Sequence, residues 1–139
     1  GGFLTPGWLG MEGAPEELAN RSLVKYRLII QEMGGWGAFQ RILDALDTVS
    51  RRHRISIPAV ALRWVLDRPA VAATITGLDS LEQARETRRA LELELDQEDR
   101  KILEVALAAS RIPPGSVYGL ERDREGPHGR IMKYNLNRG

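Results

Sequence analysis

One short apolar segment constrains the fold of this chain more than any other feature. Residues 70–76 read AVAATIT, and Pro69 and Gly77 bound them. A mostly apolar, partly β-branched run without alternation is typical of a parallel strand that is covered on both faces. A single parallel strand cannot satisfy its own backbone N–H and C=O groups. We therefore expect its partner strands to come from another part of the protein or from another chain, and we expect the chain to be incomplete.

Helical patterns precede this strand and follow a Gly- and Pro-rich loop over residues 1–20. The clearest lies over about 37–53, where apolar residues recur at helical spacing with polar residues between them. Ser56 is a good N-cap for a second helix over 57–67. A shorter helical stretch over about 22–32 ends at a pair of glycines.

Two further helices are expected after the strand. Ser80 caps the first of them while Gln83 reaches back toward the cap, in the S-x-x-Q form of the capping box. The second opens at Asp96 and runs to about residue 110. The polar, basic and Gly-containing tail that follows is assigned no regular structure. We expect His128 in this tail to be solvated and His53 to be an exposed residue near a helix end.

The composition excludes several classes of function. The 139 residues fit one domain, and a net charge of +1 gives no global attraction to nucleic acid or anionic lipid. The chain has no cysteine, which excludes disulfides, thiolate nucleophiles and Cys-ligated metal sites. This usage is compatible with a reducing cytoplasm, where we expect the protein. No segment approaches the ~20 apolar residues that a membrane helix needs, so we expect no membrane partner.

A DNA-binding interpretation rests on residues 37–67, which imitate a helix-turn-helix with three arginines and a histidine in the turn at 51–54. The second helix, however, carries Trp64, Val65 and Leu66 where a recognition helix needs polar side chains to contact bases. The nearly neutral net charge also opposes this interpretation. We therefore expect no nucleic-acid partner.

The junction between the strand and the next helix is a candidate anion site. Residues 77–81 lead from Gly77 into a capped first turn, where unpaired amides and the helix dipole favour negative charge. Most junctions of this kind bind nothing, and the charge of Asp79 would repel a phosphate. On the residues alone, an anion site and a purely structural junction both stay open.

Four motifs, taken in order, resemble the C-terminal part of aldo-keto reductases. Residues 61–71, ALRWVLDRPAV, are similar to the family's A-L-x-W-x-L-x-x-P-x-V stretch. Residues 75–87, ITGLDSLEQARET, are similar to its I-x-G-x-x-x-x-E-Q-x-x-E-N segment. LDQED at 95–99 resembles the start of the family's last helix, and GGFLT at 1–5 resembles the end of its P-L-G-G-G-x-L-T loop. The resemblance runs in order over nearly the whole chain to about Ser110.

This resemblance implies an α/β fold, a (β/α)8 TIM barrel of which the chain is a C-terminal fragment. We expect a mostly helical chain with one parallel strand at about 70–76. Residues 1–111 would form the C-terminal part of the barrel and residues 112–139 a tail or loop, while the missing N-terminal half would supply the other strands. The start at Gly1 without methionine fits a truncated or processed N-terminus, and removal of methionine before Gly1 explains it equally well.

The resemblance further implies an oxidoreductase that reduces aldehydes or ketones with a nicotinamide cofactor. In the family a tyrosine is the general acid, assisted by a lysine, an aspartate and usually a histidine. All four lie in the first part of the barrel, before this chain begins, and Tyr26, Tyr118 and Tyr134 do not match the motif tyrosine. We expect this chain to contribute cofactor-binding residues and to be inactive alone. Its partners would be the cofactor, a small carbonyl substrate and the missing half of the barrel.

Six residues match cofactor-binding positions of the family. Gly2 would approach the pyrophosphate with its backbone, and Arg21 loosely matches a basic residue that closes over the phosphates. The other four match positions that surround the adenosine 2′-phosphate and the adenine: Gly77, Asp79, Gln83 and Glu86.

Three departures from the family pattern bear on the choice of cofactor. Asp79 stands where the family often has Ser or Arg, Thr87 replaces the usual Asn, and Gly7 stands where many members place a lysine. An acidic residue near the ribose prefers a hydroxyl over a phosphate. The resemblance therefore implies NADP(H), while Asp79 leaves NAD(H) open.

A second class of function also stays open. A non-catalytic relative of the barrel, or a remnant fragment, would bind cofactor or a partner without turnover. The presence of the family's tyrosine and lysine upstream of Gly1 would discriminate an enzyme from this alternative.

Overall fold

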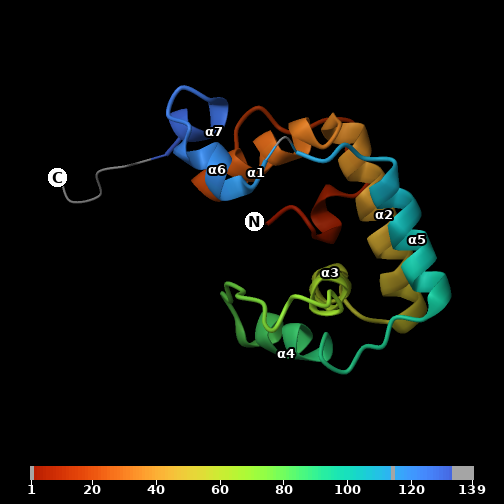
Figure 1. Ribbon diagram of the computed structural model, residues 1–139. Coiled ribbons are helices and arrows are strands. Elements are labelled where there is room, and N and C mark those ends of the chain that lie inside the picture. Colours follow the sequence, from red (N-terminus) through yellow and green to blue (C-terminus); the bar gives the residue numbers. More distant parts are fainter. Residues whose placement is uncertain (1, 114, 133–139) are drawn as a thin grey trace.

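The computed structural model is an open arc of helices (Figure 1). It describes residues 2–113 and 115–132, so that Gly1, Pro114 and residues 133–139, Tyr134 among them, lie outside the described residues. Helices α2 and α5 lie side by side and form the back of the arc. The elements in chain order are η1 (Pro6–Trp8), α1 (Arg21–Glu32), α2 (Gly35–His53), α3 (Ile57–Leu66), α4 (Leu81–Arg89), α5 (Gln97–Ala108), α6 (Val117–Arg122) and α7 (Pro127–Arg130).

All five helices expected from the sequence are present. Four of them bury apolar side chains, whereas α4 buries none and begins at its Ser80 cap. The core forms where α2 contacts α1, α3 and α5. Burying an aliphatic side chain of this kind stabilises the fold by about 1.5–3 kcal/mol. The largest fully buried apolar side chains come from α2 and α3, and they are Leu43, Val49, Ile57 and Val60.

The strand expected at residues 70–76 is not confirmed, since the described residues contain no strand. A strand exists only as part of a hydrogen-bonded ladder, and no second strand is present in the described part of the chain to pair with this segment. Most of the segment is also exposed, and none of its residues is fully buried. The side chain of Ile75 is fully exposed, with a relative accessibility of 104%.

Two short helices that the sequence pattern does not predict lie in the tail. Residues 117–132, which we call the strap, contain α6 and α7, and α7 packs against α1 in the upper arm of the arc (Figure 1). The expectation that His128 is solvated is wrong. Its side chain is 1% exposed, and its Nε2 lies 2.8 Å from Glu32 Oε1 at the end of α1.

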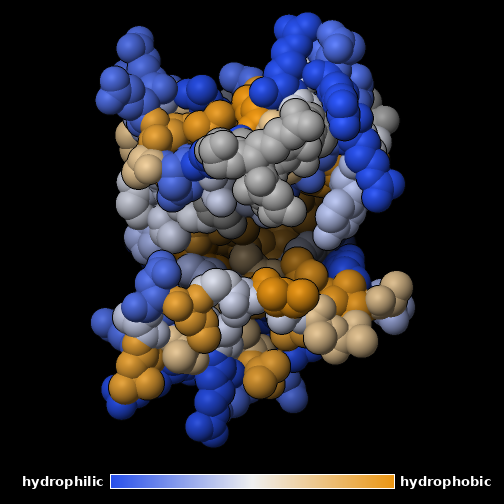
Figure 2. All heavy atoms as spheres, turned by 90° about the vertical axis from the view of Figure 1, so that its left-hand side faces the viewer, coloured by the Kyte–Doolittle hydropathy of each residue, from blue (hydrophilic) through white to orange (hydrophobic). Residues whose placement is uncertain are grey.

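The open side of the arc is hollow. Figure 2 looks into this side and shows apolar atoms in the depth of the hollow and along the lower arm, which α3 and α4 form. Several large apolar side chains of this region are exposed: Val65, Ile75, Leu78, Leu81 and Leu91. No helix in the described part of the chain is long and apolar enough to cross a membrane.

Candidate functional site

The six residues expected to bind cofactor fall into two groups in the structure. Gly2 and Arg21 lie together at the start of α1, as the packing of Gly2 against Leu23 shows. The other four lie on the segment before α4 and on α4 itself. Figure 1 places α1 and α4 on opposite arms of the arc, on either side of the hollow. The expected pyrophosphate residues are therefore brought together, and the expected adenosine residues form a separate group.

Gly2 occupies a position that only glycine suits. Its φ of +92° lies in a region that side chains other than glycine rarely adopt, and an added Cβ would lie 3.1 Å from Leu23 Cδ2. The Gly2 carbonyl oxygen accepts a hydrogen bond of 2.8 Å from Trp8 Nε1. The backbone of this loop is thus fixed close to the first turn of α1.

An aromatic cluster holds the same loop against α2. The ring centroids of Phe3 and Trp8 are 4.9 Å apart, and those of Trp36 and Phe39 are 4.8 Å apart. The indole rings of Trp8 and Trp36 meet edge to face at 6.1 Å. The Gln40 side chain also binds the loop backbone. Its Nε2 donates to the Trp8 carbonyl at 2.8 Å, and its Oε1 accepts from the Gly10 amide at 2.9 Å.

Arg21 is the first residue of α1, and its side chain is exposed. The first turn carries no acidic residue, and Asn20 caps it by accepting a 3.0 Å hydrogen bond from the Leu23 amide. A helix start of this kind has partial positive charge from its dipole, to which the guanidinium adds a full charge. In the structure the Arg21 guanidinium donates to the carbonyl oxygen of Ile131 in the strap.

Gln83 organises the turn that precedes α4. Its side-chain oxygen accepts a 2.8 Å hydrogen bond from the Asp79 amide, and its own amide donates to Ser80 Oγ at 3.1 Å. The capping box is therefore displaced by one residue, since Gln83 reaches Asp79 rather than Ser80 itself. Gly77 and Asp79 are exposed, and the first turn also carries Glu82. Two carboxylates at this turn oppose the binding of a phosphate.

The carboxylate of Glu86 is engaged within the protein. It accepts a 3.3 Å hydrogen bond from the Ser56 amide and pairs with Arg89 at 2.9 Å, while Arg89 also donates to the Arg54 carbonyl at 2.6 Å. The hydrogen bond from Arg89 holds the pKa of Glu86 below its ordinary value, against the smaller opposing effect of burial. Glu86 thus ties α4 to the connection between α2 and α3.

A shallow pocket of about 290 Å³ lies between α4 and α3, on the lower arm. Thr87, which stands where the family has Asn, lines this pocket together with Thr74 and Thr76 from the expected strand segment. The apolar part of its wall comes from α3 and from the end of α4: Leu62, Leu66, Ala84, Ala90 and Leu91.

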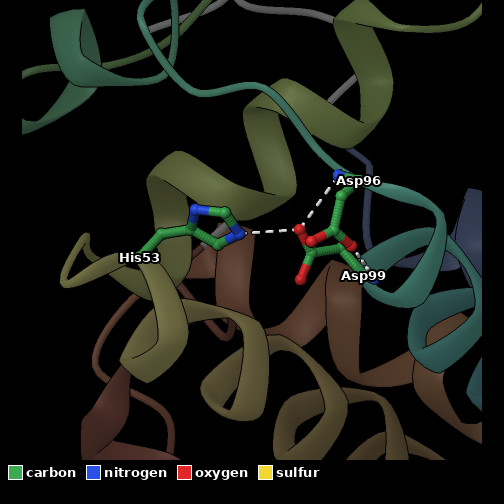
Figure 3. A group of neighbouring side chains, drawn as sticks. All are labelled: His53, Asp96 and Asp99. Atoms are coloured by element: carbon green, nitrogen blue, oxygen red, sulfur yellow. Dashed lines mark hydrogen bonds and ion pairs between the residues drawn. The ribbon is translucent and has the colours of Figure 1, made fainter.

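A second cluster, which the sequence did not predict, joins the end of α2 to the start of α5 (Figure 3). His53 Nε2 lies 2.6 Å from Asp99 Oδ2, and Asp99 and Asp96 exchange side-chain to backbone hydrogen bonds of 2.8 and 3.0 Å in a capping box. The ligand atoms of the three side chains lie within 4.8 Å of one another, as a metal site requires. His53 is partly buried, with 27% of its side chain exposed, rather than exposed as expected.

The charge around this cluster does not suit a metal ion. Arg52 forms ion pairs with Asp96 at 3.1 Å, with Asp99 at 3.0 Å and with Glu98 at 2.9 Å. The guanidinium already compensates the carboxylates and would repel a cation. We interpret the cluster as a structural junction between two helices. His53 lies 46 positions from Asp99 along the chain, so no local pattern reveals their contact.

Comparison with known proteins agrees with the motifs and their order. The model of the aldo/keto reductase family matches residues 1–108, a range that includes all six expected cofactor-binding residues. Searches of curated proteins and of solved structures found no match. Since the match covers well over half of the 139 residues, the chain belongs to the aldo/keto reductase family.

Proposed function

We propose that this chain forms the cofactor-binding part of a reductase that transfers hydride from a nicotinamide cofactor to an aldehyde or ketone. Membership of the family supports this class of reaction and this class of cofactor. One observation supports named residues: the Gly2 backbone, at a φ of +92°, packs against Leu23 in the first turn of α1, which begins at Arg21.

The start of α1 fits the pyrophosphate of the cofactor. A backbone without a side chain permits close approach, and the amino end of a helix favours an anion. Arg21 adds a planar guanidinium, whose paired N–H groups match phosphate oxygens. No acidic residue lies in the first turn of α1 to oppose this binding.

The turn before α4 would receive the adenosine end. We propose that Asp79 contacts the ribose and lowers the affinity for a 2′-phosphate, so that NAD(H) competes with NADP(H). Gln83 would act by fixing the Asp79 amide, and Glu86 by holding α4 in place, while Gly77 leaves room at the turn. The hydrogen bonds of Gln83 and Glu86 to other parts of the chain support positioning roles for both.

The cofactor would supply hydride, and the residues of this chain would bind and orient it. We assign proton transfer to none of them, because the tyrosines do not match the tyrosine motif of the family. We propose that the general acid and the remaining strands belong to the other half of the barrel, which would also give residues 70–76 the partners that a strand requires.

Titration of the chain with NADPH and then NADH, followed by tryptophan fluorescence, tests the proposal. Trp8 donates to the Gly2 carbonyl, so a ligand at Gly2 is expected to change its emission. Saturable quenching should occur, and Arg21→Gln should weaken it. Lys101→Gln, which removes an exposed charge from α5, is the matched control. A chain with helical circular dichroism that responds to neither nucleotide would contradict the proposed function.

A further inference from the structure

The strap lies along the whole length of α1. Arg21, the first residue of the helix, donates to the carbonyl of Ile131, and Glu32, its last residue, pairs with the buried His128. Between them, Lys25 forms an ion pair with Glu121 on α6. The hydrogen bond that Lys25 donates to the Glu121 carboxylate raises the pKa of Lys25. The strap is therefore anchored to α1 at three points, at its start, near its middle and at its end.

A close backbone contact gives the strap its shape. A Cβ at Gly129 would lie 1.9 Å from the Asp123 carbonyl oxygen and 2.6 Å from its carbon, which is far inside van der Waals contact. Only glycine therefore allows α7 to fold back on the segment after α6. Before the strap, the Arg111 amide donates to the Met33 carbonyl at 2.9 Å and returns the chain from α5 to the end of α1.

The contact with Ile131 affects the residue that the proposed function assigns to the cofactor phosphates. A guanidinium that donates to a strap carbonyl has its side-chain conformation fixed by that contact. Phosphate oxygens are charged and are stronger acceptors than a neutral carbonyl, so cofactor and strap compete for the same donor. The measured cofactor affinity is therefore reduced in proportion to the fraction of molecules in which Arg21 is free to bind the cofactor.

We propose that the strap is an autoinhibitory element, which lowers cofactor affinity by holding the Arg21 guanidinium on the Ile131 carbonyl. This inference rests on the proposed function, in which Arg21 binds the cofactor phosphates. Because coupling between two binding events is reciprocal, cofactor releases the strap to the same extent as the strap weakens cofactor binding.

Two variants of the full chain loosen the strap without touching Arg21. Gly129→Ala disrupts the shape of the strap, and Glu32→Gln removes the charge that faces His128. Each is expected to tighten NADPH binding about three- to tenfold, the range for losing one competing hydrogen bond of ordinary net strength. Arg122→Gln, at the exposed end of α6, is the matched control and should leave the affinity unchanged.

The same variants are then combined with Arg21→Gln. If the strap acts through Arg21, Gly129→Ala and Glu32→Gln no longer change NADPH affinity in this background. Limited proteolysis gives a second readout, since saturating NADPH should speed cleavage within residues 117–132 of the parent chain. If Gly129→Ala changes affinity and Glu32→Gln does not, local misfolding of the strap is the cause and the autoinhibitory role is overturned.

The outcomes separate the two proposals. A parent chain that binds NADPH, with strap variants that bind equally or more weakly, overturns the autoinhibitory role and leaves the proposed function intact. Tightening that persists with Arg21→Gln also overturns it. Failure of the parent and of every strap variant to bind either nucleotide overturns the proposed function, and the strap proposal with it. Binding by the strap variants alone supports both.

Discussion

The guanidinium of Arg100 on α5 reaches the carboxylate of Asp67 at the end of α3, with 2.5 Å between Nη2 and Oδ2. Arg63 Nε donates to the other oxygen at 2.7 Å. Asp67 is only 10% exposed, and although its burial favours a higher pKa, the hydrogen bonds from Arg63 and Arg100 lower the pKa below its ordinary value. This carboxylate links the lower arm of the arc to its back.

Asp67→Asn is expected to reduce the free energy of unfolding by about 1.5–3 kcal/mol, the range for hydrogen bonds to charged groups. The amide keeps the shape of the side chain and loses the charge that two arginines share. Urea unfolding at neutral pH measures the loss. Asp44→Asn, on the exposed face of α2, is the control, and an equal effect of the two substitutions would rule out a special role for Asp67.

The same carboxylate should contribute to stability in a pH-dependent way. Its folded pKa lies below the unfolded value of about 3.9, so its contribution is complete above that value and is lost as the pH falls through the folded pKa. Between neutral pH and about pH 3, the parent chain should therefore lose more stability than Asp67→Asn does. Urea unfolding at a series of pH values measures this difference. Equal losses of unfolding free energy in the two proteins as the pH falls would disprove the prediction.

Asp79→Ser should shift the cofactor preference toward NADPH, by about fivefold in the ratio of the two dissociation constants. The substitution removes a negative charge from the turn that would receive the 2′-phosphate. Glu82→Gln is the control, because it removes one negative charge from the first turn of α4. Comparing the two variants separates a specific contact of Asp79 from a general effect of net charge. A similar shift in both variants would show that only the net charge matters.

Glu86→Gln and Arg89→Gln each remove one charged partner of the ion pair between Glu86 and Arg89. Both residues are about a third or more exposed, so each variant should lose no more than about 1 kcal/mol of stability. If Glu86 acts by holding α4, the two variants should weaken cofactor binding equally. A much larger loss of binding for Glu86→Gln would instead indicate direct contact with the adenine.

Gly34, the N-cap of α2, and Gly35, its first residue, provide a matched pair for backbone strain. Both have positive φ, at +116° and +80°, but only a Cβ at Gly34 would meet a neighbour, Ala38 Cβ at 3.2 Å. Replacing either with alanine should cost about 1–2 kcal/mol from the backbone conformation alone. Thermal unfolding should place Gly34→Ala below Gly35→Ala in stability, and the reverse order would contradict the role of the Ala38 contact.

The sequence predicted the features that depend on neighbouring residues. The apolar spacing in α2 and the caps at Ser80 and Asp96 act within a few residues, and these helices form as expected. The strand predicted at 70–76 is not confirmed, because a strand needs hydrogen-bonding partners from another segment. The division into a barrel portion at 1–111 and a tail at 112–139 stays a prediction.

The parts that were missed depend on contacts between distant residues. Helices α6 and α7 have 6 and 4 residues, too few for a periodic pattern. The pairing of His128 with Glu32 spans 96 positions, and that of His53 with Asp99 spans 46.

The edge-to-face pair of Trp8 and Trp36 has a spectroscopic consequence. Two indoles this close share their excited states, so their electronic transitions split and acquire rotational strength from each other's orientation. The near-ultraviolet dichroism of the chain should therefore be dominated by this pair, while the isolated Trp64, which faces the Arg68 guanidinium, contributes little. That signal would follow the docking of the Gly2 loop on α2 separately from helix content, without an added label.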